Sequence, residues 1–308
     1  MAKGVGMILV ILGHYYYTPH IDFIYLFHMP LFFFLSGIFF KKDLPFGPFI
    51  ISKFKGLIVP YLFFRICASL FDAIFVTLRG NRFTETFFLA IKRTLILDPD
   101  DPTWFLIALF LIQLLIWLLV HFIKNKYVIA VIASVFAVLQ YLNGSNLPCQ
   151  LDEVAAFMIY FFVGWCVGSK ELFTSNGRRV VIAALSLSLL CLCYALQSLS
   201  LSPWLGCALN YLAGSSGIVM TICICHLFNF SSIRYIGSNS IIYLGFHIRI
   251  MANVIWDALY LLHWNGNEIH GLSMVLYSIV TMILLFSILY VITRIMTRRP
   301  FCFLIGKK

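Results

Sequence analysis

The stretch TWFLIALFLIQLLIWLLVHFI, residues 103–123, contains no Asp, Glu, Lys or Arg. Its length lies within the roughly 17–25 mostly apolar residues that a helix needs to cross a bilayer. The rest of the chain has the same character, because 62% of its 308 residues are hydrophobic and 11% are charged. A typical soluble domain carries about 25% charged residues. So little charge cannot cover a protein in water, and we expect an integral membrane protein.

Apolar runs separated by polar breaks recur along the whole chain. There are about ten, at residues 4–17, 23–40, 56–78, 103–123, 127–142, 154–169, 180–198, 206–228, 239–258 and 272–293. None alternates at period two, and lipid requires the backbone of each span to pair its own polar groups, so the runs are predicted to be helices. We expect an all-α integral membrane protein with about ten transmembrane helices in one bundle, and a single domain over residues 1–308.

The basic residues predict the orientation of this bundle. With a cytoplasmic N-terminus, sixteen fall inside: Lys3, Lys41, Lys42, Lys53, Lys55, Lys124, Lys126, Lys170, Arg178, Arg179, Arg234, Arg294, Arg298, Arg299, Lys307 and Lys308. Four fall outside: Arg79, Arg82, Lys92 and Arg93. Cytoplasmic loops of membrane proteins are enriched in Lys and Arg, so both termini are predicted to be cytoplasmic. The formal charge of +10 therefore reflects orientation and not nucleic-acid binding.

The nine cysteines do not have the spacing of a metal site. The pairs Cys191/Cys193 and Cys223/Cys225 lie in apolar runs, and helical residues two apart point about 200° away from each other. Neither pair can therefore close on one metal ion. An odd number of mostly buried thiols also gives no disulfide framework. We expect no metal and interpret these thiols as small apolar packing residues.

Ionisable residues inside the apolar runs are the better functional candidates. A charge in lipid costs free energy, so such residues are usually retained for a function. They are His14, His28, Arg65, Asp72, His226, His247, Arg249 and Asp257. Each also has a structural interpretation. A neutral histidine can hydrogen-bond to a neighbouring helix, and either aspartate can pair with Arg65 or Arg249.

His14 is distinguished by the residues that precede it. Lys3 lies eleven positions upstream with nothing ionisable between, which corresponds to about 16 Å along one helix. A cation at the cytoplasmic mouth suits a phosphate, and an imidazole at depth suits proton transfer. A long acyl donor with phosphates at one end and a thioester at the other requires this arrangement. The alternative is a positive-inside lysine and a structural histidine with no connection.

Five segments, in order, resemble the acyltransferase-3 family of integral membrane enzymes. They are K-GVGMILVILG-H (3–14), FHMPLFFFLSGIFF (27–40), KFKGLIVPYLFF (53–64), TWFLIALF (103–110) and IGSNSIIYLGFH (236–247). The second is most similar to the branch that acetylates sugars. The family's first helix carries an arginine, ten residues and a histidine. Here Lys3 replaces the arginine and keeps the charge without the bidentate fork. Residues that usually precede that helix are missing, as they would be if the native chain starts upstream.

The resemblance implies transfer of an acetyl or short acyl group to a hydroxyl of a cell-envelope glycan or lipid-linked sugar. Acetyl-CoA would be the cytosolic donor and co-substrate, and the protein would be a multi-pass protein of the cell membrane, typically a bacterial inner membrane. Besides acetyl-CoA and the acceptor, the bilayer is the expected partner, and nucleic acid is not.

The site residues expected from the motifs fall into three groups. His14 is the candidate general base, with a covalent acyl-histidine as the alternative. The candidate oxyanion stabilisers are Ser36, Asn239, Ser240 and His247. Lys3 with Lys41, Lys42, Lys53 and Lys55 would bind donor phosphates, although the last four are also ordinary positive-inside residues. His28, Trp104, Arg65 and Arg249 would contact the substrate. If His247 and Asn239 line the same cavity as His14, His247 must lie close to His14.

Two other classes of function fit the composition. A proton-coupled transporter would also place histidine and arginine inside the membrane. It predicts inverted repeats and interrupted helix pairs, which the sequence does not show. A membrane scaffold without chemistry would leave the spacing of Lys3 and His14 unexplained.

Overall fold

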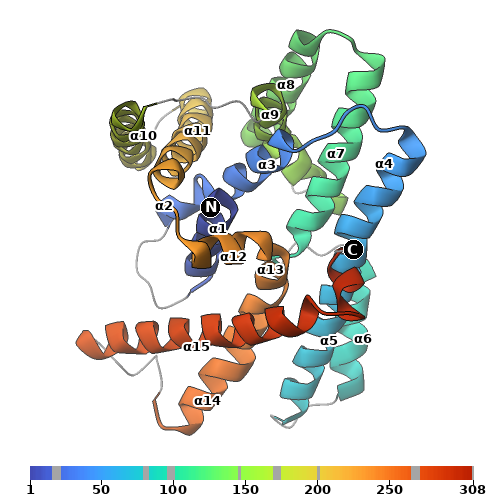
Figure 1. Cartoon of the computed structure of the whole chain (residues 1–308), viewed down its shortest axis with the longest axis vertical. Helices are drawn as coiled ribbons and strands as arrows, with labels where there is room; N and C mark the ends of the chain where they lie inside the picture. The colour runs from blue at the N-terminus through green and yellow to red at the C-terminus, as the bar shows by residue number, and fades with distance from the viewer. Residues whose placement is uncertain are drawn as a thin grey trace. The chain divides into compact units, whose positions relative to one another are not determined.

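The computed structural model describes residues 1–15, 22–78, 83–95, 101–144, 147–168, 175–199, 202–264 and 271–306. The regular structure over these ranges is helical, and none of them forms a strand (Figure 1). The chain divides into two compact units that interleave along the sequence. The first unit comprises Met1–Gly13, His20–Phe46 and Ala108–Ser238; the second comprises His14–Pro19, Gly47–Ile107 and Asn239–Lys308. The single domain predicted from the sequence stays a prediction.

The first unit contains most of the long apolar helices. These are α1 (Ala2–Gly13), α2 (Asp22–Tyr25), α3 (His28–Ile38), most of α7 (Trp104–Phe122), α8 (Lys126–Asn143), the 3₁₀ turn η2 (Pro148–Gln150), α9 (Leu151–Val167), α10 (Asn176–Gln197), α11 (Pro203–Leu227) and α12 (Ser231–Ser238). Helices α10 and α11 lie side by side, and α3 packs along α9. Local signals set several ends. The Asn125 side chain accepts a hydrogen bond from the Tyr127 N–H at the start of α8, and Gly144 ends it in a left-handed conformation.

Glycine lets α3 and α9 approach closely. A Cβ at Gly37 would overlap the Phe161 carbonyl, and a Cβ at Gly164 would overlap the Phe34 carbonyl. The contact is therefore reciprocal between the two backbones. In membranes, small residues at helix interfaces supply packing that the hydrophobic effect cannot supply, since lipid is as apolar as the side chains.

The second unit contains the remaining helices. These are α4 (Phe46–Lys53), the π-helical turn η1 (Phe54–Ile58), α5 (Val59–Leu78), α6 (Phe83–Leu95), the first turn of α7, α13 (Ser240–Arg249), the π-helical segment η3 (Ile250–Ile255), α14 (Trp256–Leu261), α15 (Leu272–Met296) and the 3₁₀ segment η4 (Phe301–Ile305). Helix α5 packs against α6 and against α13. Gly245 of α13 lies directly against the Phe64 ring of α5, where a Cβ would not fit. This close approach brings the polar residues of both helices together.

Seven helical segments in the described part of the chain are long and apolar enough to cross a membrane. They are Phe46–Thr77, Trp104–Phe122, Lys126–Asn143, Pro148–Val167, Asn176–Gln197, Pro203–Leu227 and Leu272–Met296. Together with the all-helical structure, they agree with the predicted all-α membrane bundle. The run predicted at 56–78 is longer than expected, because α4, η1 and α5 continue one another from Phe46.

The other three of the ten predicted runs are helical but shorter or divided. The helix in the run at 4–17 ends at Gly13, and the run at 23–40 consists of α2 and α3. The run at 239–258 passes from α-helix through the π-helical η3 into α14. π-Helical turns inside α-helices frequently accompany functional sites. Hydropathy alone does not register these changes of helix type.

Candidate active site

Two histidines from distant parts of the sequence meet in the second unit. His14 is the residue directly after the last residue of α1, and His247 lies in the last turn of α13. The Nε2 atom of His247 is 3.4 Å from the Nδ1 atom of His14, and the two rings meet edge to face with centroids 5.1 Å apart. His14 is half-buried and His247 has no exposed surface. The expected proximity of His247 to His14 is therefore found.

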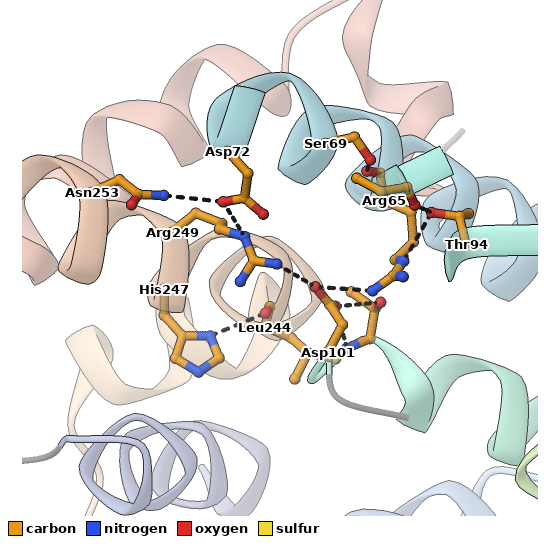
Figure 2. Close-up of polar contacts among 11 residues, drawn as sticks. Arg65, Ser69, Asp72, Thr94, Asp101, Leu244, His247, Arg249 and Asn253 are labelled. Carbon is orange, nitrogen blue, oxygen red and sulfur yellow. Dashed lines mark hydrogen bonds and ion pairs between the residues drawn. The ribbon is translucent and has the colours of Figure 1, made fainter. Parts of the chain in front are cut away.

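The other nitrogen of the His247 ring bonds to its own helix. Its Nδ1 atom is 2.9 Å from the Tyr243 carbonyl oxygen. The same atom is 3.0 Å from the Leu244 carbonyl oxygen, a contact that Figure 2 shows. A carbonyl oxygen only accepts hydrogen bonds, so Nδ1 must carry the hydrogen. In the neutral ring Nε2 then carries the lone pair, and it is this atom that faces His14.

Beside His247 lies a cluster of two arginines and two aspartates, all in the second unit. Arg65 and Asp72 come from α5, Arg249 from α13, and Asp101 from the segment directly before α7. Nε of Arg249 is 3.0 Å from Oδ1 of Asp72, and Nδ2 of Asn253, in η3, donates to the same oxygen at 3.1 Å. Figure 2 shows these side chains pointing toward one another. The formal charges of the two arginines and two aspartates balance, as expected for charged side chains among apolar helices.

Asp101 connects the two arginines. Its Oδ2 atom lies 3.3 Å from Nη1 of Arg65 and 3.2 Å from Nη2 of Arg249. Its Oδ1 atom accepts hydrogen bonds from the backbone N–H and the hydroxyl of Thr103, at 3.0 Å and 2.6 Å. Asp101 therefore ties the start of α7 to both α5 and α13.

Helix geometry explains why α5 can supply two members of this cluster. Arg65, Ser69 and Asp72 are spaced four and then three positions apart and so share one helix face. Arg65 is held further by its Nε atom, which donates to the Thr94 hydroxyl of α6 at 3.2 Å. The Ser69 hydroxyl donates to the Arg65 carbonyl at 2.8 Å. The Arg65 side chain is thus buried among fixed partners.

The predicted substrate-binding arginines are both engaged with carboxylates in this structure. The pair Arg249–Asp72 was one of the structural alternatives for these residues. Asp101 was missed, because its sequence DPDDP reads only as an acidic turn. The available signal was an Asp two positions before Thr103 at the start of a long apolar helix, a common arrangement for holding a helix N-terminus. Contact of either arginine with substrate stays a prediction.

Two other predicted residues also lie in the second unit. Asn239 is the N-terminal flanking residue of α13 and is buried. Trp104 is the first residue of α7 and is half-buried, with its ring centroid 6.4 Å from that of Phe105. Their roles as oxyanion stabiliser and sugar-stacking residue stay predictions.

His28 and Ser36 lie on α3 in the first unit. His28 is buried, and its Nδ1 atom is 2.8 Å from the Ile24 carbonyl oxygen. The Ser36 hydroxyl donates to the Phe32 carbonyl one turn earlier, at 2.8 Å. In these contacts both side chains bond to backbone carbonyls four residues earlier in the chain.

The predicted phosphate-binding lysines are distributed over both units. Lys3 lies in the first turn of α1, with Nζ 5.2 Å from the centroid of the Phe39 ring. Lys41, Lys42 and Lys55 are exposed, and Lys53 is half-buried with Nζ 5.7 Å from the Phe49 ring centroid. Nζ of Lys42 also lies 3.9 Å from Oδ1 of Asp43. Binding of donor phosphates by these lysines stays a prediction.

In the described part of the chain, neither a group of metal-ligating residues nor the apolar cavity of the first unit marks another site. Among the described residues, no three His, Cys, Asp or Glu side chains are placed to hold a metal ion. A cavity of about 480 Å³ in the first unit lies among α3, α8, α9 and α11. It is lined by apolar and aromatic side chains, including Tyr160, Trp204 and Tyr211. None of the predicted site residues lines it.

Comparison with known proteins bears on the activity. The family model of the acyltransferase domain matches residues 1–294, which is nearly the whole chain. No curated protein and no solved structure matches the chain. Members of this family are acyltransferases, which favours the enzyme over the transporter and the scaffold. With its several apolar spanning helices, the chain belongs to the acyltransferase-3 family and is a multi-pass membrane acyltransferase.

Proposed function

We propose that this acyltransferase transfers an acetyl group from cytosolic acetyl-CoA to a hydroxyl of a cell-envelope glycan or lipid-linked sugar, with His14 as general base. The cell membrane, typically a bacterial inner membrane, would be its location. The observation that carries the proposal is the contact between His14 and the fully buried His247 in a chain of this family.

The reaction requires a general base that removes a proton from the acceptor hydroxyl. An unprotonated imidazole nitrogen of His14 takes the hydroxyl proton while the hydroxyl oxygen attacks the thioester carbonyl carbon. The tetrahedral intermediate then collapses, the carbon–sulfur bond breaks, and the thiolate of CoA takes up the proton. The products are the O-acetylated sugar and CoA, and His14 returns to its starting state.

The donor would be held at its phosphates. Lys3 at the start of α1 provides a point charge suited to a phosphate, while its partner ring of Phe39 leaves the ammonium hydrogens able to bond elsewhere. Lys41, Lys42, Lys53 and Lys55 fall on the same predicted cytoplasmic side and add positive charge. Acetyl-CoA would therefore enter from the cytoplasm with its thioester directed toward His14.

The acceptor and the developing oxyanion need further groups. Trp104 offers a half-buried ring for stacking on a sugar. Ser36 and Asn239 are the proposed hydrogen-bond donors to the oxyanion. His28, Arg65 and Arg249 are the proposed contacts with substrate oxygen atoms, and for the two arginines this requires hydrogen-bonding capacity beyond their carboxylate partners.

Labelled acetyl transfer in membranes tests the proposal. Membranes that contain equal amounts of wild type, His14→Ala or His226→Ala would be incubated with acetyl-labelled acetyl-CoA and candidate glycans. His226 in α11 of the first unit is a control histidine with no proposed role, and its Nδ1 atom lies 2.8 Å from the Ile222 carbonyl of its own helix. We expect transfer by wild type and His226→Ala and a roughly 10²–10⁴-fold lower turnover for His14→Ala. Equal turnover of all three proteins would reject His14 as the base.

Kinetic patterns separate direct transfer from the acyl-histidine alternative. Direct attack requires both substrates to be bound together, so initial rates should give intersecting double-reciprocal lines. A covalent intermediate gives parallel lines and label on the protein in the absence of acceptor.

A further inference from the structure

We infer that His247 is a positioning residue that sets the tautomer and orientation of His14, so that Nε2 of His14 is the nitrogen that takes the proton. This inference rests on the proposed role of His14. It follows from which ring atoms meet and which atoms they bond.

The first step concerns the hydrogen between the two rings. Nδ1 of His247 donates to the carbonyls of Tyr243 and Leu244, so its Nε2 atom carries the lone pair in the neutral ring. A second proton would place a charge on a side chain without exposed surface, which burial opposes. At 3.4 Å, the hydrogen between the rings must therefore belong to Nδ1 of His14.

The second step follows from the chemistry of imidazole. A neutral ring carries one N–H, so a hydrogen on Nδ1 of His14 leaves Nε2 unprotonated. The acceptor hydroxyl must then approach from the Nε2 side of the ring. A third group that orients a catalytic histidine in this way is a recurring feature of acyl-transfer sites.

The third step concerns the charged state. When His14 takes the proton it becomes an imidazolium, and its Nδ1–H continues to donate to Nε2 of His247. A hydrogen bond from a charged donor is stronger than one from a neutral donor. The contact therefore stabilises the form of His14 that develops in the transition state more than its resting form.

The Arg249–Asp101 contact helps to hold His247 in place. Arg249 follows His247 by two residues in the last turn of α13, and its Nη2 atom is 3.2 Å from Asp101. The ring of His247 is also fixed by its own backbone bonds. His247 thus belongs to a rigid support, while His14 lies at a helix end and gains its orientation from the contact.

Two substitutions distinguish positioning from packing. His247→Gln places an amide near the position of Nε2 and keeps an acceptor for His14. His247→Asn is shorter and keeps only a group near Nδ1. We expect His247→Asn to lower kcat about 10–100-fold, in the range for losing a hydrogen bond to a charged group, with the KM for acetyl-CoA unchanged. His247→Gln should recover most of that loss. Equal loss in both variants, or a change in KM alone, would overturn the inference.

Nitrogen NMR of the wild-type enzyme provides a readout that requires no variant to be active. Protein labelled with ¹⁵N-histidine in nanodiscs would show the tautomer of each ring, with the His14 signals assigned from their loss in His14→Ala. We expect His14 and His247 both protonated on Nδ1. A His14 ring protonated on Nε2 would overturn the inference even if His14 proves to be the base. The Nδ1 tautomers combined with full activity of His14→Ala would instead reject the proposed function and leave the tautomer assignment standing.

Discussion

The carboxylate of Asp101 lies 3.2 Å from the guanidinium of Arg249, although 148 residues separate them in sequence. The same Oδ2 atom lies 3.3 Å from Arg65. The side chains of Asp101 and Arg249 are mostly buried, with 7% and 22% of their surfaces exposed. One carboxylate therefore pairs with two cations from different helices, and Asp72, 3.0 Å from Arg249, supplies the second negative charge.

Asp101→Asn should destabilise the protein, because it preserves shape and removes the charge that both arginines share. Removing one partner of a buried ion pair costs about 3–5 kcal/mol. Thermal unfolding in detergent should show a clear decrease in Tm. Asp43→Asn is the control, since Asp43 is 88% exposed and its nearest cation, Lys42, is 3.9 Å away. Equal Tm values for the two variants would show that the cluster does not contribute to stability.

Gly164→Ala should also destabilise the protein, through packing. Its Cβ would overlap the Phe34 carbonyl, so α3 and α9 would have to separate. Gly177→Ala in α10 is the matched control, because nothing lies within 4 Å of its Cβ position. Alanine favours helix over glycine by up to about 1 kcal/mol, so Gly177→Ala should be neutral or stabilising. The measurement is the fraction of each variant that stays folded in detergent after heating to a series of temperatures. A Gly164→Ala protein as stable as Gly177→Ala would contradict the close contact between α3 and α9.

Lys3→Ala should raise the KM for acetyl-CoA and leave kcat nearly intact, the pattern for loss of binding that is equal in ground and transition states. Lys3→Arg should be tolerated, because the charge is kept. Lys126→Ala is the control, since Lys126 also lies over an aromatic ring, with Nζ 5.5 Å from the Tyr127 centroid, and has no proposed role with the donor. Steady-state transfer at varied acetyl-CoA measures both constants. A fall in kcat alone for Lys3→Ala would remove Lys3 from the donor site.

The orientation of the chain is open to a direct test. Single cysteines at Lys124 and Arg178, in a background without the native cysteines, should react with an impermeant reagent only from the cytoplasmic side. A cysteine at Asp152 should react only from the opposite side. The physical reason is the sixteen-to-four distribution of basic residues over the two predicted sides. Labelling of position 178 from the outside would show that the predicted orientation is wrong.

The sequence by itself determined the class of protein, its long apolar helices and its family. Long runs without charge, such as 103–123, can only pair their backbone groups as helices in lipid, so they predict α7 directly. His14 and His247 could also be found as ionisable residues within apolar runs. The shorter spans were less predictable, because hydropathy does not show where a helix ends or changes to a π-helical turn, as at η3.

Tertiary structure decided which of these groups act together. The contact of His14 with His247 joins positions 233 residues apart, and the role of Asp101 depends on the packing of α5, α13 and the start of α7. Periodicity reports which face of a helix is apolar but not which helices become neighbours. A charged group in lipid must find a partner of opposite charge, and where that partner lies is settled only when the helices pack.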